Sequence, residues 1–139
     1  MRKISELLTD ARAIIEDKSH WTQEAHARRA NGDAVFADDP GAVCFCADGA
    51  MRRAAGTTTN AKTGKLIHDD ADSQYMSARN YMHVAALRVS GRAAYMGIND
   101  GDFDVPGMDP HTAILAVFSA AIDRAKSAEE IGFNGPGSA

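Results

Sequence analysis

The sequence predicts an all-α protein: a compact four-helix domain with a long ordered loop before the last helix. Apolar residues recur at offsets of three and four in four segments, which is the spacing of one helix face, and no segment gives a convincing sheet pattern. The length of 139 residues fits one domain, and 45% hydrophobic residues can supply a core. We therefore expect a single helical domain over residues 1–131 and a flexible tail over residues 132–139.

The first helix is predicted near the amino terminus, where apolar residues form a single stripe. It should end between Asp17 and His20, because polar residues replace the periodicity there. The stripe consists of Ile4, Leu7, Leu8, Ala11, Ile14 and Ile15.

A turn is predicted after this helix, at Asn31-Gly32. Both residue types tolerate positive φ, and the short segments on either side, within residues 27–39, could pair as a small hairpin.

The second helix is predicted to begin at Asp39, which can cap it, followed by Pro40 at the first helical position. Gly56 should end it. Its inward positions would be Val43, Cys46 or Ala47, Ala50, Met51 and Ala54.

The last two helices have clear start signals. After a loop over residues 57–65, Asp69 or Asp70 can cap a third helix that Gly91 ends. Asp109 and Pro110 then open the final helix. Between them, residues 92–107 are rich in glycine and aspartate, so we expect an ordered loop there, with an extended start over residues 93–98.

Composition excludes several classes of protein. The formal charge of -4 comes from well-mixed signs, so no basic surface is expected to attract nucleic acid. The sequence contains no run of about 18 apolar residues, the length needed to cross a membrane. Near the amino terminus, acidic residues interrupt the segment that would have to form the apolar core of a secretory signal. Cys44 and Cys46 are too few and too close for a disulfide framework. These features favour a cytoplasmic protein.

Cys46 is the sharpest candidate for chemistry. Inside a helix that starts at Pro40, its thiol would feel the positive helix terminus, and one of the histidines could act as its base. The alternative is a small buried side chain that packs beside Gly49 and Ala50. No cysteine-protease signature surrounds it, so packing is the favoured interpretation.

Metal and cofactor chemistry has no support in the sequence. The five histidines are scattered and show no HExxH spacing. The acids after His68 are better explained as helix caps, and an EF-hand starting at Asp100 fails because Val105 and His111 occupy its glycine and glutamate positions. Arg52 and Arg53 are interpreted as complementing the carboxyl end of the second helix. We therefore predict no metal and no cofactor.

The segments WTQ, DDPGAVCFCADGAMRRAAG and IND, followed by TAILAVFSAAIDRA, resemble an uncharacterised family of small bacterial and bacteriophage proteins. That family shows W-x-Q, W-C-A-x-G-A-L and W-N-D segments before a closing helix. The resemblance implies a shared fold and an association with phages or mobile elements, and it implies no established activity. The family pattern maps onto Trp21, Gln23, Cys46, Gly49, Ala50, Asn99 and Asp100.

Four of these positions form a candidate ligand site: Trp21, Gln23, Asn99 and Asp100. They are predicted in segments that flank helices, where binding residues tend to lie, and together they could line a polar and aromatic pocket. The alternative is structural: the tryptophan plugs one end of the bundle, while the amides satisfy backbone groups.

The function expected from these observations is a non-catalytic ligand-binding or protein-interaction module, which could be a phage accessory protein. Its partner would be a small molecule or a protein, and the alanine-rich core makes a homodimer possible. The alternative function is a small cysteine-dependent enzyme that uses Cys46 with a histidine base. The sequence offers only one component of such a catalytic site, a candidate nucleophile, so we favour a binding function.

Overall fold

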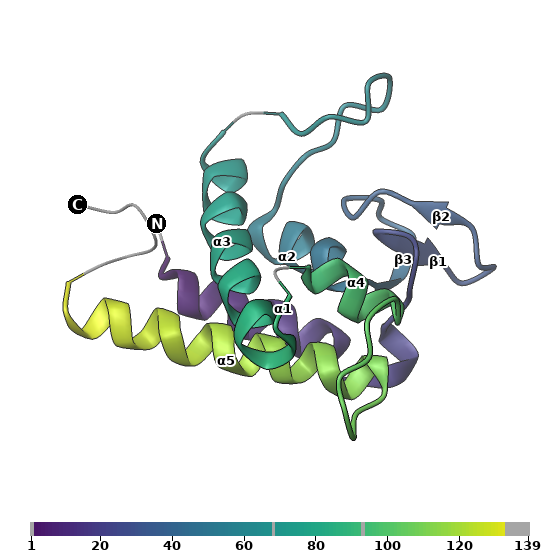
Figure 1. The fold of residues 1–139 in the computed structure, drawn as a ribbon. Helices are drawn as coiled ribbons and strands as arrows, with labels where there is room; N and C mark the ends of the chain where they lie inside the picture. Colours follow the sequence, from purple (N-terminus) through teal and green to yellow (C-terminus); the bar gives the residue numbers. More distant parts are fainter. Residues whose placement is uncertain (1, 68, 93, 133–139) are drawn as a thin grey trace.

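The computed structural model describes residues 2–67, 69–92 and 94–132 (Figure 1). Residues 133–139, most of the predicted tail, lie outside this part. In chain order the elements are α1 (Ile4–Glu16), the short 3₁₀ helix η1 (Lys18–His20), β1 (Ala27–Arg29), β2 (Ala34–Val35), β3 (Ala42–Phe45), α2 (Ala47–Ala55), α3 (Asp70–Ser90), α4 (Tyr95–Asp100) and α5 (Pro110–Glu130).

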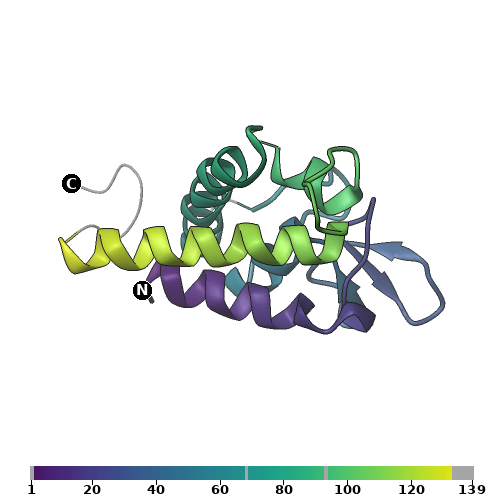
Figure 2. The same ribbon diagram turned by 60° about the horizontal axis from the view of Figure 1, so that its bottom comes forward.

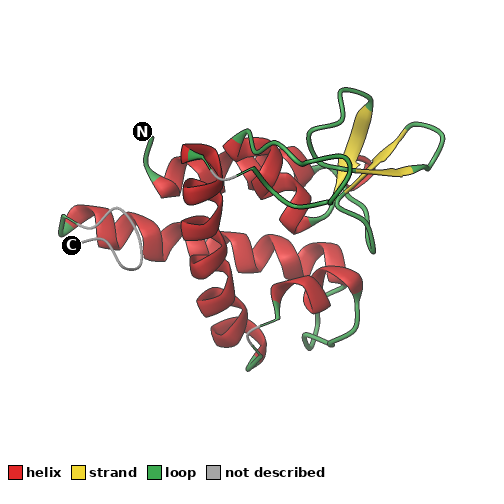
Figure 3. Ribbon diagram, turned by 90° about the horizontal axis from the view of Figure 1, so that it is seen from above, coloured by secondary structure: helices red, strands yellow, loops and turns green. Residues whose placement is uncertain are grey.

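The helices form one part of the molecule and a small sheet lies at one end of it. Helices α1 and α5 run side by side, and α3 crosses them (Figures 1 and 2). Figure 3 shows the strands set apart from the helices, at the end where α2 begins. Large side chains with no exposed surface fill the helical core, among them Leu7, Leu8, Met82, Ile114 and Phe118.

The all-α prediction is wrong, because the described residues include a three-stranded antiparallel sheet in the order β2-β1-β3. The hairpin around Asn31-Gly32 is present, with β1 paired to β2 and Gly32 at φ 92°. Strand β3 adds to its other side, where Ala27 faces Phe45. The sheet has few residues, and that explains why no alternating pattern signals it.

The predicted start of the second helix is also wrong. Residues 42–45 form β3, and α2 begins only after Cys46, its N-cap residue. Asp39 caps a turn instead, because its Oδ1 accepts a hydrogen bond from Gly41 N, 2.8 Å away. An aspartate followed by proline suits a turn as well as a helix start. The end of the helix is as predicted, at Gly56 with φ 77°.

The other predicted helices are confirmed, together with their caps. Asp69 accepts from Asp72 N at the start of α3, and Gly91 ends that helix in the left-handed conformation. Asp109 accepts from Thr112 N at the start of α5, with Pro110 in its first turn. Helix α1 covers the predicted amphipathic segment. Apolar periodicity and capping residues therefore predict α1, α3 and α5 correctly.

Helix α4 was not predicted, because residues 92–107 were expected to form a loop with an extended start. The helix has only six residues, too few for a periodic pattern to appear. Its residues Tyr95, Ile98 and Asn99 are nevertheless buried, and it packs against α5. The prediction failed because tertiary burial, not local periodicity, stabilises this turn of helix.

A close backbone approach joins the sheet to α2. A Cβ atom at Gly49, in the first turn of α2, would lie only 1.8 Å from the carbonyl oxygen of His26. The same carbonyl accepts a hydrogen bond from Cys46 N, 3.2 Å away. Only glycine fits at this position. Because glycine has no side chain, the segment before β1 can lie directly against α2.

We predict that Gly49→Ala destabilises the protein by about 2 kcal/mol or more, because the added methyl must push the His26 backbone away from α2. Helix propensity alone predicts the opposite sign, a gain of about 1 kcal/mol. Urea denaturation of both proteins measures the difference. A more stable variant would contradict the close approach.

Candidate functional site

The structure brings together the four residues of the sequence-predicted ligand site. The Asn99 side chain is fully buried at its centre. Its Oδ1 accepts hydrogen bonds from Trp21 Nε1 at 2.9 Å and from Ala47 N, the first residue of α2, at 3.0 Å. Its Nδ2 donates to Thr22 O at 3.1 Å and to Asp100 Oδ1 at 2.9 Å. One amide thus joins α4, α2 and the segment that leads into the sheet.

The same contacts fix the backbone of residues 21–24. Gln23 Nε2 donates to Asn99 O at 3.0 Å, and Glu24 N donates to Asp100 Oδ1 at 3.0 Å. Glu24 has φ 63°, a left-handed conformation that is rare for residues other than glycine and that persists only where surrounding contacts hold it. We call this set of bonds the Asn99 clamp, made by Trp21, Gln23, Asn99 and Asp100.

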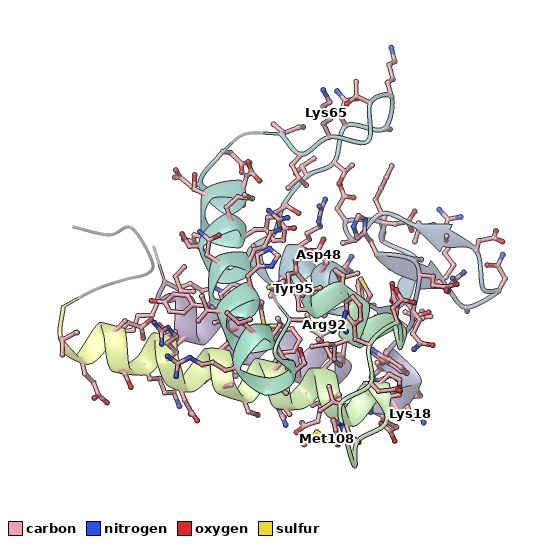
Figure 4. The ribbon with its side chains drawn as sticks, in the orientation of Figure 1. Lys18, Asp48, Lys65, Arg92, Tyr95 and Met108 are labelled. Carbon is pink, nitrogen blue, oxygen red and sulfur yellow. The ribbon has the colours of Figure 1, made fainter. Side chains whose placement is uncertain are left out.

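A buried carboxylate forms the second polar centre. Asp48 lies in the first turn of α2, in the middle of the molecule beside Tyr95 (Figure 4). Its Oδ1 accepts from the hydroxyls of Tyr75 and Tyr95, both at 2.6 Å. Its Oδ2 accepts from Arg52 Nε at 2.8 Å and lies 3.3 Å from His26 Nε2. We call these five residues the Asp48 cluster.

The cluster keeps the carboxylate ionised. Burial acts to raise the pKa of Asp48, but the contacts with His26, Arg52 and the two tyrosines outweigh it and hold that pKa well below its ordinary value. The pKa values of the two tyrosine hydroxyls shift in the opposite direction. Burial and the neighbouring Asp48 charge raise the pKa of Tyr75 to about 12, and they also raise the pKa of Tyr95. Both tyrosines therefore stay neutral donors at physiological pH.

Two surface hollows adjoin the cluster. The first, the His26 hollow, has a volume of about 400 Å³; its lining residues are Glu24, Ala25, His26, Ala34, Val35, Phe36 and Asp39. The second, the Arg52 hollow, has a volume of about 650 Å³; its lining residues are Arg52, Gly64, Lys65, Leu66, Asp72, Ser73 and Met76. Each hollow is thus lined by one side chain that contacts Asp48: His26 in the first hollow and Arg52 in the second.

Cys46 lies apart from both hollows as a fully buried N-cap residue. Its Sγ accepts a hydrogen bond from Gly49 N at 3.3 Å. Burial raises the pKa of its thiol to about 12, with the charge of Asp48 adding to the effect. The thiol is therefore protonated near neutral pH, which favours the packing interpretation over a nucleophile.

Neither a metal-binding cluster nor a membrane-spanning helix is found in the described part of the chain. No group of three or more histidine, cysteine, aspartate or glutamate side chains there is placed to hold a metal ion. None of the described helices combines the length and the apolar character needed to span a membrane.

Sequence reasoning missed the Asp48 cluster. Arg52 lies in the last turn of α2, as predicted, but it also pairs with Asp48 one turn earlier. That i,i+4 spacing of opposite charges was the one signal visible in the sequence. The tyrosines come from α3 and α4, and His26 precedes β1, so only the fold brings them to the same carboxylate.

Comparison with known proteins identifies a family for this chain. Residues 1–124 match the family described as "Family of unknown function (DUF6197)". No curated protein and no solved structure matches the chain. The match agrees with the resemblance to an uncharacterised family, and it gives no support to a bacteriophage origin.

We predict that native protein at pH 7.5 reacts with iodoacetamide at Cys46 at less than about one-hundredth of the rate seen in urea, because burial keeps the thiol protonated and covered. Cys44, which is half-buried on β3, serves as the internal comparison. Peptide mass spectrometry separates the two sites. Rapid selective alkylation of Cys46 in the native protein would contradict this prediction and would support a nucleophilic role for the thiol.

Proposed function

The chain belongs to this family of unknown function, and we propose that it is a non-catalytic binding protein whose ligand carries a positive charge on an apolar body. The proposed site is the His26 hollow. Its volume of about 400 Å³ falls within the usual range for small-molecule sites. The observation that carries the proposal is that the lining of this hollow contains both a carboxylate without a partner among the described residues and an exposed aromatic ring.

The carboxylate belongs to Glu24. Its backbone N–H is bound to Asp100, but within the described residues its side chain has no hydrogen bond or ion pair. The other acid in the lining, Asp39, is already paired with Arg29 at 2.7 Å. Glu24 is therefore the group available to an ammonium or guanidinium ion.

The apolar part of the hollow comes from the hairpin. Phe36 is 39% exposed, and Val35, its neighbour in the chain, is half-buried. A cation that also contacts an aromatic face gains roughly 0.5–1 kcal/mol at an exposed site. The lining thus suits an amine that bears an alkyl or aryl group.

The two polar centres hold this hollow in shape. The Asn99 clamp fixes the strained backbone at Glu24, and Asp48 holds the ring of His26, whose side chain is 37% exposed. In this proposal the predicted residues Trp21, Gln23, Asn99 and Asp100 act by positioning the segment that contacts the ligand. Rigid supports of this kind lower the entropy lost on binding.

A binding role is preferred to the cysteine enzyme for a chemical reason. Cys46 is buried, its thiol is protonated near neutral pH, and it does not line the His26 hollow. A histidine next to a carboxylate, without a nucleophile beside it, meets too few requirements of a catalytic site.

We predict that benzylamine binds to the His26 hollow and that Glu24→Gln weakens this binding about twofold to fivefold, because the ion pair is lost. Chemical-shift titration of the ¹⁵N-labelled protein measures the affinity and locates the shifts. The control is Glu130→Gln, which removes an equal charge at the far end of α5. Benzyl alcohol, of similar shape and neutral, should bind more weakly.

A tripeptide with a central lysine and blocked ends distinguishes a free amine from a peptide side chain as the source of the charge. Tighter binding of the peptide than of benzylamine would assign the site to a protein partner. Equal binding of benzylamine to the wild type and to Glu24→Gln would contradict the proposal.

A further inference from the structure

A second site adjoins the Asp48 cluster in the Arg52 hollow, between the α2–α3 loop and the first turns of α3. We propose that this hollow binds a small organic carboxylate with an aliphatic tail. The carboxylate would contact Arg52 and Lys65, and the tail would lie against Leu66 and Met76. This inference is independent of the proposed function, because it concerns different residues and a ligand of opposite charge.

Arg52 is held in place before any ligand arrives. Its Nε donates to Asp48, its Nη2 lies 3.4 Å from the Tyr75 hydroxyl, and its guanidinium carbon sits 4.9 Å from the centre of the Tyr75 ring. The side chain is only 16% exposed. Within the described residues Nη1 has no hydrogen-bond partner, so it remains available to an anion.

Lys65 supplies the second cation. It lies on the α2–α3 loop (Figure 4), and its ammonium group has no ion pair among the residues that the structure describes. A fixed guanidinium and an exposed ammonium that line the same hollow suit a carboxylate, because the guanidinium orients the anion and the flexible stem of lysine lets its ammonium approach it. The hydroxyl of Ser73 is a further donor in the lining.

Lys65 is the charged side chain of the lining that has no counter-charge among the described residues. Arg52 and Lys65 are its two cations, and Asp72 is its one acid. Asp72 is buried and already has an interaction within the chain, so it is not a free counter-charge. A bound carboxylate would therefore meet Nη1 of Arg52, whose charge Asp48 already balances, and the ammonium group of Lys65.

The remaining surface of the hollow is apolar. Met76 on α3 is 41% exposed, and Leu66, which is half-buried, belongs to the same lining. Methionine adapts its shape to an alkyl chain with little loss of packing. This pairing of two cations with an aliphatic wall separates an alkyl carboxylate from phosphate or sulfate, which would leave the wall exposed to water.

The test uses hexanoate, with isothermal titration calorimetry for affinity and ¹⁵N chemical shifts for location. We expect hexanoate to shift the amides of residues 64–66 and 73–76. 1-Hexanol and hexylamine should bind at least about tenfold more weakly, because they lack the anion. Acetate should also bind more weakly, because it lacks the tail.

Two variants at exposed residues outside the Asp48 cluster are expected to leave the fold intact. Lys65→Gln and Met76→Ser should each weaken hexanoate binding about fivefold. Their matched controls are Lys62→Gln, on the same loop, and Leu87→Ser, an exposed residue of α3; neither residue lines the hollow, so both should bind as the wild type does.

Hexanoate binding that is unaffected by Lys65→Gln and by Met76→Ser would overturn the proposal, as would equal binding of 1-hexanol. Absence of hexanoate binding in the folded wild type would also overturn it. Glu24→Gln, the variant of the His26 hollow, should leave hexanoate binding unchanged, so the two sites are tested separately.

Discussion

The ionised carboxylate of Asp48 is the constraint on which the arrangement of this protein depends. One side chain in the first turn of α2 is bound by a residue next to the sheet, by its own helix, and by tyrosines from α3 and α4. A buried ion pair adds little net stability, but loss of one partner leaves a charge without compensation and costs about 3–5 kcal/mol. We therefore interpret the Asp48 cluster as fixing the relative positions of these elements more than as adding to their stability.

The amino-terminal turn of α2 is the junction at which this constraint acts. Asp48 is bound there, Asn99 accepts from Ala47 N, and the His26 carbonyl fills the space that Gly49 leaves open. The two hollows follow from this junction. His26 lines one, Arg52 lines the other, and both contact the same oxygen of Asp48. The geometry of each candidate site is thus set by a residue that lines neither hollow.

Local signals predicted much of the fold and little of the candidate sites. The caps at Asp69 and Asp109 and the stop at Gly91 act within one helical turn, so the sequence reveals them directly. The start of α2 was misplaced because Asp39 and Pro40 suit a turn as well as a helix. Asn99 and Trp21 were expected together only through the family resemblance. The Asp48 cluster depends on contacts between residues up to 47 positions apart, which periodicity does not report.

The pKa of the Asp48 carboxyl group tests this account most directly. In the folded protein it lies below the ordinary value of 3.8, so the cluster contributes stability at neutral pH that is lost as the pH falls through the lower, folded-state value. Carbon-detected NMR of ¹³C-labelled aspartate follows the Asp48 carboxyl signal directly. We predict that this signal shows no titration from pH 7 down to the onset of acid unfolding. A midpoint at or above 3.8 in the folded protein would contradict the account.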